Sequence, residues 1–284
     1  MRITSFALVI MLSVTMLIVT ACKSGSCSGL SSSGDTAVAV AMRHVADSSS
    51  FVLSNGERCS IVATADIQFP SKVFAQGASL DSLKRLFARY VLDADASMPM
   101  DDALKQVVAN SMHQYDFMAE PAQSKSDDNG ESRSAVACTT NTRVAPVYNK
   151  NGVVTFERVD VVKRNGKVSS LTHRYFSFDV KAMAYIDLNR MFREDAIADV
   201  CQLLKQQLFA QNNADSNEQL NDLGFFNVEN ISVTRNFFFD DKGVTWSFLP
   251  NELAVEAIGE PRISISYDDL DDFLCDGSII DSLN

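Results

Sequence analysis

The sequence predicts an α+β fold, with antiparallel sheets built from hairpins and helices packed on one face. Three observations predict it. Apolar and polar residues alternate over several segments, as in half-buried strands. Asn165-Gly166 joins two of these segments as a hairpin turn. Isolated stretches with helical periodicity stand between them. The 284 residues are 46% hydrophobic, which is enough for the core of one large domain or two smaller ones.

The N-terminal 21 residues have the organisation of a lipoprotein signal peptide. Arg2 precedes an apolar run over residues 6–21, and Val19-Thr20-Ala21 places an aliphatic and two small residues before Cys22. Small residues allow a signal peptidase to close on the backbone, and the Cys22 thiol is the group that carries a lipid as a thioether. An uncleaved membrane helix is the alternative, but the run has about 16 residues where a span needs about 20.

We therefore predict four segments. Residues 1–21 are a lipoprotein signal peptide, 22–56 the lipidated cysteine and a flexible tether, 57–170 an N-terminal α+β region and 171–284 a C-terminal α+β domain. The tether begins with a Ser- and Gly-rich stretch, and its second part, with no clear period, is expected to be an extended lead-in. Localisation follows as the cell envelope. Lys23 rather than Asp follows the cysteine, and its resemblance to the sorting signals of Gram-negative bacteria implies the outer membrane rather than the inner.

The first half of the folded region predicts one strand, two helices and a loop. Residues 58–69 alternate, and Pro70 is expected to end that strand. Ser79 is expected to cap a helix that runs to residue 92, and Asp101 a second helix. The polar stretch 120–134 predicts a loop.

The second half predicts more strands and two helices. Cys201 lies on the apolar stripe of one helix, so its thiol is expected to be buried. Trp246 and Phe248 share a strand face and are expected in the core, and Gly243 is expected to hold a turn conformation that side chains resist. The predicted strands are 136–148, 153–162, 168–178, 225–239, 244–249 and 262–267, with a turn at 240–243 and helices at 195–210 and 268–274.

Charge and cysteine content limit the partners and sites. The chain carries a net charge of −11, which becomes −12 over the 263 residues left after loss of Arg2 with the signal peptide. Such a chain lacks the basic footprint of a nucleic-acid-binding protein but attracts basic proteins, although acidity also serves solubility alone. Besides Cys22 and the tether's Cys27, the remaining cysteines are far apart, so we predict no zinc site; they are Cys59, Cys138, Cys201 and Cys275. The five cysteines without lipid are odd in number, so at least one has no partner within the chain.

Side chains with catalytic potential form no recognisable motif. His44, His113 and His173 have neither metal nor triad spacing. The pairs Asp240-Asp241 and Asp268-Asp269 suit a turn and a helix start. No phosphate loop or hydrolase motif occurs. We therefore predict no catalytic residue, no metal and no cofactor.

Two segments resemble the RsiV-like domain family, found at the C-terminus of anti-sigma-V factors and of the peptidoglycan deacetylase PdaC. Residues 237–274, FFFDDKGVTWSFLPNELAVEAIGEPRISISYDDLDDFL, follow that family's order of strand, acidic turn, aromatic strand, Pro-Tyr-Glu stretch and final strand. Upstream, Phe176-Ser177-Phe178-Asp179 and the stretch 186–192 resemble its segment before a helix. Asn251 and Glu256 replace two family tyrosines, and Leu171-Thr172-His173-Arg174-Tyr175 stands near the place of a missing Gly-Gly-Ala-His.

The resemblance covers residues 170–275 and implies a binding role, because one relative's ectodomain binds lysozyme, a basic protein. We therefore expect a membrane-anchored, non-catalytic binding module for a protein or a cell-wall-derived ligand, and lysozyme is one candidate. The alternative is an envelope hydrolase or carbohydrate-active enzyme with an unrecognised site. A pocket with two convergent carboxylates would favour the enzyme, and a broad acidic or aromatic groove would favour the binding module.

Overall fold

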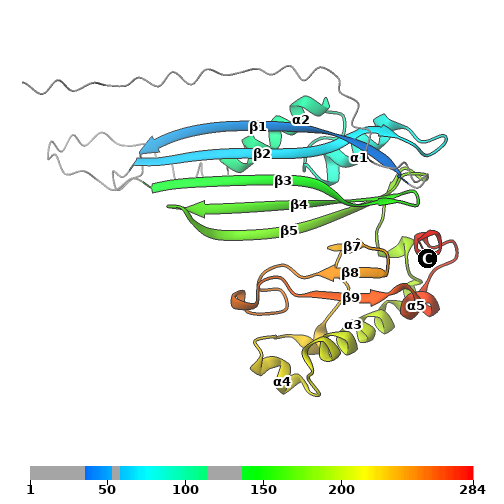
Figure 1. Cartoon of the computed structure of the whole chain (residues 1–284). Helices are drawn as coiled ribbons and strands as arrows, with labels where there is room; N and C mark the ends of the chain where they lie inside the picture. The colour runs from blue at the N-terminus through cyan, green and yellow to red at the C-terminus, as the bar shows by residue number, and fades with distance from the viewer. Residues whose placement is uncertain (1–35, 53–57, 114–135, 284) are drawn as a thin grey trace, which may run out of the picture. The chain divides into compact units, whose positions relative to one another are not determined.

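The computed structural model describes residues 36–52, 58–113 and 136–283, and residues 34–284 form one compact unit (Figure 1). Within it a six-stranded sheet has the order β1-β2-β3-β4-β5-β6 and a three-stranded sheet the order β7-β8-β9. The predicted α+β class is confirmed. The long strands are β1 (Val38–Val52), β2 (Arg58–Val73), β3 (Val136–Lys150), β4 (Val153–Arg164) and β5 (Lys167–Asp179), and β6 (Ala184–Tyr185) is short.

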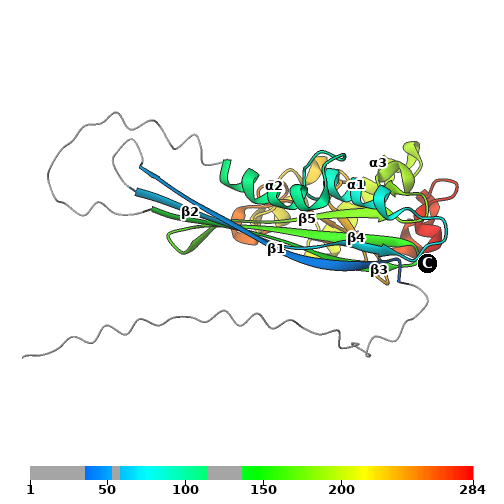
Figure 2. The same cartoon turned by 90° about the horizontal axis from the view of Figure 1, so that it is seen from above.

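One strand pair in the large sheet is parallel. All its neighbours run antiparallel except β2 and β3. Parallel neighbours need a long crossover, and this one carries α1 (Leu80–Tyr90) and α2 (Met100–His113). Figure 2 shows both helices along one face of the sheet. The Ser79 hydroxyl accepts a hydrogen bond from the Ser82 amide and caps α1 as predicted.

The core between the helices and the large sheet follows from alternation along the strands. In β2 every second residue from Cys59 to Ile67 is buried, as the alternation predicts. Leu83, Phe87, Leu104 and Val107 of the helices pack against this face in the same cluster. Farther along the same face, Cys59, Ile61, Val136 and Cys138 form a smaller apolar cluster, and polar residues of β3, β4 and β5 lie beside it.

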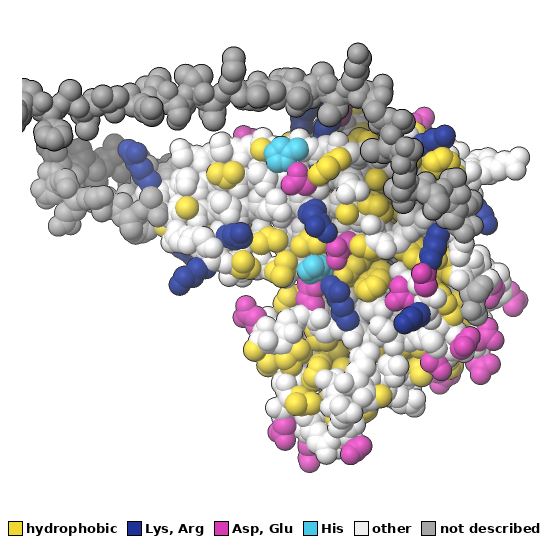
Figure 3. All heavy atoms as spheres, viewed as in Figure 1, with side chains coloured by type: hydrophobic (Ala, Val, Ile, Leu, Met, Phe, Trp, Pro, Cys, Tyr) yellow, Lys and Arg dark blue, Asp and Glu magenta, His cyan; other side chains and the backbone are white. Residues whose placement is uncertain are grey.

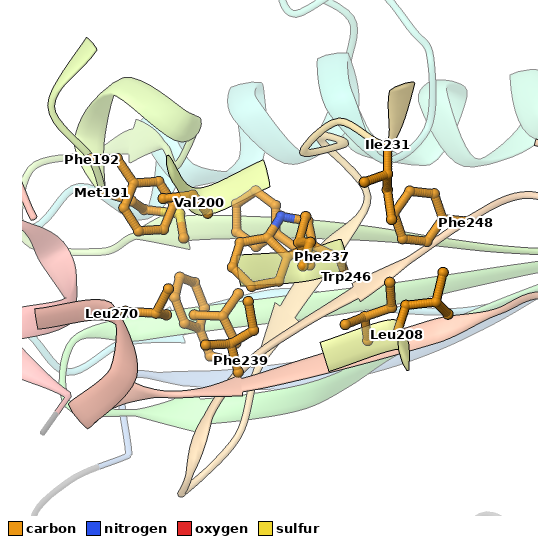
Figure 4. Close-up of a cluster of buried hydrophobic side chains, with 14 of the residues drawn as sticks. Met191, Phe192, Val200, Leu208, Ile231, Phe237, Phe239, Trp246, Phe248 and Leu270 are labelled. Atoms are coloured by element: carbon orange, nitrogen blue, oxygen red, sulfur yellow. The ribbon is translucent and has the colours of Figure 1, made fainter. Parts of the chain in front are cut away.

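The C-terminal part folds around the small sheet, with β7 (Phe237–Phe239), β8 (Gly243–Ser247) and β9 (Arg262–Ser266). The helices are α3 (Ile197–Asn212), α4 (Asn217–Asp222) and α5 (Tyr267–Leu270). Figure 4 shows the aromatic centre of its core, where Trp246 lies beside Phe237, and Val200 and Leu208 of α3 belong to the same cluster. Trp246 is 0% and Phe248 3% exposed, which confirms both as core residues. Short 3-10 turns complete it at Leu188–Arg190, Glu194–Ala196, Val228–Asn230, Glu256–Ile258, Asp271–Phe273 and Ile279–Ser282.

Turn chemistry fixes the central hairpin. Asn165 and Gly166 both have positive φ angles, 50° and 78°, in the turn between β4 and β5. Two consecutive residues with positive φ match the right-handed twist of the paired strands. The hairpin predicted from Asn-Gly is therefore confirmed, with a bulge at Val162/Lys163.

Several sequence expectations need correction. Residues 38–52, assigned to the tether and lead-in, form β1, an edge strand paired with β2 along its length. Pro70 does not end β2, because it sits at the β1–β2 bulge, where a missing amide hydrogen is tolerated. α2 begins at Met100, so Asp101 lies in its first turn and does not cap it. Cys201 is only partly buried.

The predicted strand 225–239 is mostly absent. Only residues 237–239 belong to a strand, and Phe225 makes a single bridge to Ala254. The aromatic and β-branched residues before Asn236 fill the core from a 3-10 turn and loops. Gly243 does not have a positive φ, so the predicted turn conformation is wrong; glycine is needed there because an added Cβ would lie 1.9 Å from the carbonyl oxygen of Ile265.

Three predicted segments lie wholly or largely outside the described residues: the signal peptide, Cys22 with its Ser/Gly-rich stretch, and the loop 120–134. β5 runs through residue 170, so the large sheet takes strands from both predicted regions of the folded chain. Within the described ranges, no helix is both long enough and apolar enough to span a membrane.

Candidate functional site

A cavity of about 540 Å³ lies between β5 and the connection from β8 to β9. We call it the interface pocket. Apolar, acidic and basic side chains all contribute to its lining, so it offers contacts to a ligand of mixed character. The lining residues are Val168, Ser169, Ser170, Leu171 and His173 from β5, and Pro250, Asn251, Glu256, Gly259, Glu260 and Arg262 from the connection and β9.

The pocket forms where the two sheets meet at the edge of β5. β6 pairs only with residues 178 and 179, so the rest of this edge faces the C-terminal part. The Asn236 side chain binds the backbone at this edge of β5. Its Oδ1 accepts a hydrogen bond from the Tyr175 amide at 2.8 Å, and its Nδ2 donates to the carbonyls of His173 and Ser247 at 3.0 Å. Glu260 Oε1 accepts from the His173 amide at 2.8 Å. Two side chains thus join the sheets without a continuous ladder.

Glu157 organises the side chains beneath the pocket. Its Oε1 accepts from the Tyr175 hydroxyl at 2.9 Å and lies 2.9 Å from Nδ1 of His173. Burial raises the pKa of Glu157, but the hydrogen bonds from His173 and Tyr175 and the charges of His173 and Arg262 outweigh it, so the pKa is lowered. Glu157 is therefore a carboxylate that holds His173 in a fixed orientation.

Arg262 covers the other side of this cluster. Its guanidinium carbon lies 5.8 Å from the ring centre of Tyr175 and 5.9 Å from that of Phe238. Burial and the charge of Glu157 raise the pKa of Tyr175 despite Arg262. The phenol therefore stays protonated and donates to Glu157 throughout the neutral range.

Exposed apolar side chains surround the pocket. Val168 and Leu171 of β5 are 58% and 44% exposed, and Val255 and Ile258 of the connection are 44% and 38% exposed. Leu223 and Phe226 extend this patch, because backbone hydrogen bonds from Val255 to Gly224 and from Phe226 to Leu253 hold the two loops together. Clustered apolar surface of this kind is typical of an interaction site.

Charge divides unevenly along the chain. Residues 181–284 contain 19 Asp and Glu against 7 Lys and Arg, a net charge of −12. Residues 1–180 contain 17 against 18, a net charge of +1. Figure 3 shows acidic side chains along the outer rim of the C-terminal part, while most of the basic side chains in this view lie over the large sheet and its junction with that part. The whole negative charge of the protein is thus concentrated in the part that contains the small sheet.

The residues singled out from the sequence are not gathered into one centre. His44 pairs with Asp66 at 2.7 Å on the exposed side of β1 and β2, His113 ends α2, and only His173 lines the interface pocket. Asp240 accepts from the amides of Lys242 and Gly243 in the predicted turn. Asp268 and Asp269 occupy the first turn of α5 as expected.

Sequence reasoning missed the link between His173 and Glu157. In the described parts of the chain, no group of three or more His, Cys, Asp or Glu side chains is placed to hold a metal ion. Glu256 and Glu260 both line the pocket, but Glu260 is engaged by the His173 amide and Glu256 is exposed on a turn. This geometry suits the binding of a cationic or polar group beside an apolar rim.

Comparison with known proteins gives a family model that matches part of the chain and solved structures with a similar fold. Residues 189–268 match the family described as "Protein of unknown function (DUF3298)", and this segment includes the β8–β9 connection. The solved structure of a DUF3298 family member from Bacteroides fragilis is similar, with 17% identity and a TM-score of 0.68 over 88% of this chain and 99% of that one. The solved structure of a DUF3298 family protein from Pseudomonas aeruginosa is also similar, with 14% identity and a TM-score of 0.53 over 84% of this chain and 96% of that one. At these identities the similarity concerns the fold alone. No curated protein matches the chain.

Proposed function

We propose that this protein is a lipid-anchored envelope protein whose folded part is a non-catalytic binding module for a basic protein partner. The observation that carries the proposal is the division of charge, −12 in residues 181–284 against +1 in the rest. A concentrated acidic surface attracts and orients a basic partner during encounter. The resemblance to RsiV-like domains makes lysozyme the first partner to test.

The interface pocket supplies a place for close contact. Glu252 and Glu256 are exposed on the β8–β9 connection, beside the apolar side chains of Val255 and Ile258. A lysine or arginine of the partner would meet these carboxylates while apolar contacts exclude water around them. Binding of this kind needs no residue to change its protonation state.

Calorimetry with the unit formed by residues 34–284 tests the proposal. Lysozyme should bind with measurable heat at low salt and more weakly at moderate salt, because the screening length falls to about 8 Å near physiological ionic strength. The double variant Glu252→Gln, Glu256→Gln should lower the affinity about tenfold or more. The matched control is Asp271→Asn, Asp272→Asn, which removes the same charge beyond the other end of β9.

The two variants separate local docking from general attraction. Equal weakening by both would mean that lysozyme senses only net charge and does not use the pocket. Absence of heat at both salt concentrations would rule out lysozyme as the partner.

An envelope hydrolase is the second candidate, because His173, Glu256 and Glu260 line one pocket. Its test is hydrolysis of peptidoglycan or of soluble glycans by the purified protein. Turnover that is lost in Glu260→Gln but kept in Asp271→Asn would replace the binding proposal with an enzymatic one.

A further inference from the structure

A second cavity, of about 260 Å³, lies on the face of the large sheet that carries α1 and α2, opposite the face of the interface pocket. It lies beyond the apolar core under these helices. We call it the polar pocket. Its floor comes from β3, β4 and β5, and the last turns of α2 form one wall. The lining residues are Asn110, Ser111, Thr140, Asn141, Thr142, Arg158, Asp160, Val161, Val162, Ser170, Thr172 and Arg174.

Strand register places the polar groups together. Thr142 pairs with Asp160, Asp160 with Thr172, and Arg158 with Arg174. Directly paired residues share a sheet face. The same face of the same strands carries Phe156 and Phe178 under the helices, so the change from apolar to polar occurs partway along each strand.

Asp160 is fully engaged and fixes the two arginines. Thr142 Oγ1 donates to its Oδ1 at 2.6 Å, Arg158 Nε reaches both carboxylate oxygens at 3.2 and 2.9 Å, and Arg174 Nη2 reaches Oδ2 at 3.1 Å. Arg158 also donates to the carbonyl of Val91 at 2.9 Å. One carboxylate faces two arginines, so the lining keeps one net positive charge, and Arg174, whose side chain is 49% exposed, is the arginine open to a ligand.

The buried hydroxyl of Thr140 favours a ligand-binding site over an ordinary solvated sheet surface. It is 5% exposed, and its Oγ1 has no hydrogen-bond partner among the described residues. A buried hydroxyl without a partner is costly, so such groups in folded proteins usually have one. Thr140 lies on the same face as Asp160 because it pairs with Val162, and it lines the polar pocket.

We propose that the polar pocket binds the carboxylate or phosphate group of a small anionic ligand. Arg174 presents the net positive charge of the lining, and the hydroxyls of Thr140 and Thr172 supply neutral donors. The carbonyl end of α2 opposes an anion with about half a charge, which is less than the full charge of Arg174. A volume of about 260 Å³ exceeds the space of a single water molecule several-fold.

Thermal unfolding of the full chain in mild detergent tests this site, with the fluorescence of Trp246, the only tryptophan, as the signal. Sodium acetate and sodium phosphate at 50 mM are compared with sodium chloride at equal ionic strength, and glucose serves as a neutral probe. A ligand that binds only the native state raises the midpoint. We expect a rise of about 2 °C or more with at least one of the two anions; acetate alone would identify a carboxylate site and phosphate alone a phosphate site.

Two variants and one control tie the effect to the pocket. Arg174→Gln should abolish the anion-dependent rise. Thr140→Val should reduce the rise and, because it removes an unpartnered hydroxyl while keeping the side-chain shape, should raise the midpoint without anion. Lys163→Gln removes the same charge from β4 outside the pocket lining and should keep the full rise.

The proposal is overturned if neither anion raises the midpoint above chloride, or if Arg174→Gln responds as the unmodified chain does. A rise with glucose that survives Arg174→Gln would also overturn it, because the pocket would then recognise a neutral polyol.

Discussion

A Cβ atom on Gly243 would lie 1.9 Å from the carbonyl oxygen of Ile265, on the neighbouring strand β9. The clash is with backbone, which no side-chain rotation relieves. We predict that Gly243→Ala destabilises the protein by about 3 kcal/mol or more, at the upper end of overpacking effects. Urea unfolding followed by Trp246 fluorescence measures this loss.

Gly166 provides the control for this prediction. It has a positive φ of 78°, but nothing lies within 4 Å of an added Cβ. Gly166→Ala should therefore cost only the backbone strain, about 1 kcal/mol. If the two alanine variants lose similar stability, close packing of β8 on β9 is not what requires Gly243.

Truncation of Trp246 should be among the most damaging changes in the C-terminal core. The side chain is fully buried and contacts Phe192 and Phe237, with ring centres 6.3 and 6.4 Å away. Trp246→Ala should cost about 3–5 kcal/mol. Because Nε1 is buried without a partner among the described residues, Trp246→Phe should lose clearly less. Circular dichroism during urea unfolding gives both values, and equal losses would mean that Nε1 is satisfied.

The long periodic segments were predictable because local pattern decides them. Alternation identified β2 and Asn165-Gly166 identified the β4–β5 turn. β1 was not predicted because its central residues are exposed on both faces and therefore show no apolar alternation. This edge strand is held mainly by backbone pairing with β2. Residues 225–236 were wrongly predicted as a strand because apolar residues can fill a core from loops as well as from a strand.

The sites depended on contacts between distant segments. Glu157 pairs with Tyr175 and Val159 with His173 across the hairpin, so the register counted outward from Asn165-Gly166, with allowance for the bulge, would have placed Glu157 beside His173. Nothing local indicates that Asn236 or Glu260 reaches the edge of β5, 61 and 87 residues away. Such pairs arise only when the two sheets meet.

Native thiols should differ in reactivity. Cys59 and Cys138 are buried in one apolar cluster, whereas Cys201 and Cys275 are partly exposed. Burial and the neighbouring Cys138 raise the pKa of Cys59, and the thiolate is the reactive form. In the reduced protein Cys59 should react with iodoacetamide at neutral pH about tenfold or more slowly than Cys275. Peptide mass spectrometry over time measures the rates, and equal rates before denaturation would contradict the burial.

Membrane attachment is predicted to depend on Cys22, which lies outside the described residues. Cys22→Ala should leave the precursor unprocessed or move the protein to the soluble envelope fraction, because no lipid is then attached. Cys27→Ala, in the same Ser- and Gly-rich stretch, is the matched control and should fractionate with membranes. Normal processing and membrane recovery of the Cys22 variant would rule out the lipid anchor.

Stability at acid pH should depend on Glu157. Its pKa is lower in the folded protein than in the unfolded chain, so as the pH falls the unfolded chain takes up the proton first. The stabilisation is therefore complete above the unfolded pKa, about 4.3, and is lost as the pH falls through the lower folded value. Glu157→Gln should remove this contribution, which lowers stability at pH 7 by about 1–3 kcal/mol, the range for a hydrogen-bonded buried charge.

The same variant should also flatten the pH dependence of stability below about pH 4.5, because a glutamine does not titrate there. Urea unfolding at pH 7, 5, 4 and 3 tests both effects. Glu218→Gln, at an exposed position in α4, should leave both the stability at pH 7 and its decline unchanged. If Glu157→Gln declines with acid as steeply as the unmodified protein, the carboxylate under the interface pocket is not held ionised by His173 and Tyr175, and another group accounts for the acid sensitivity.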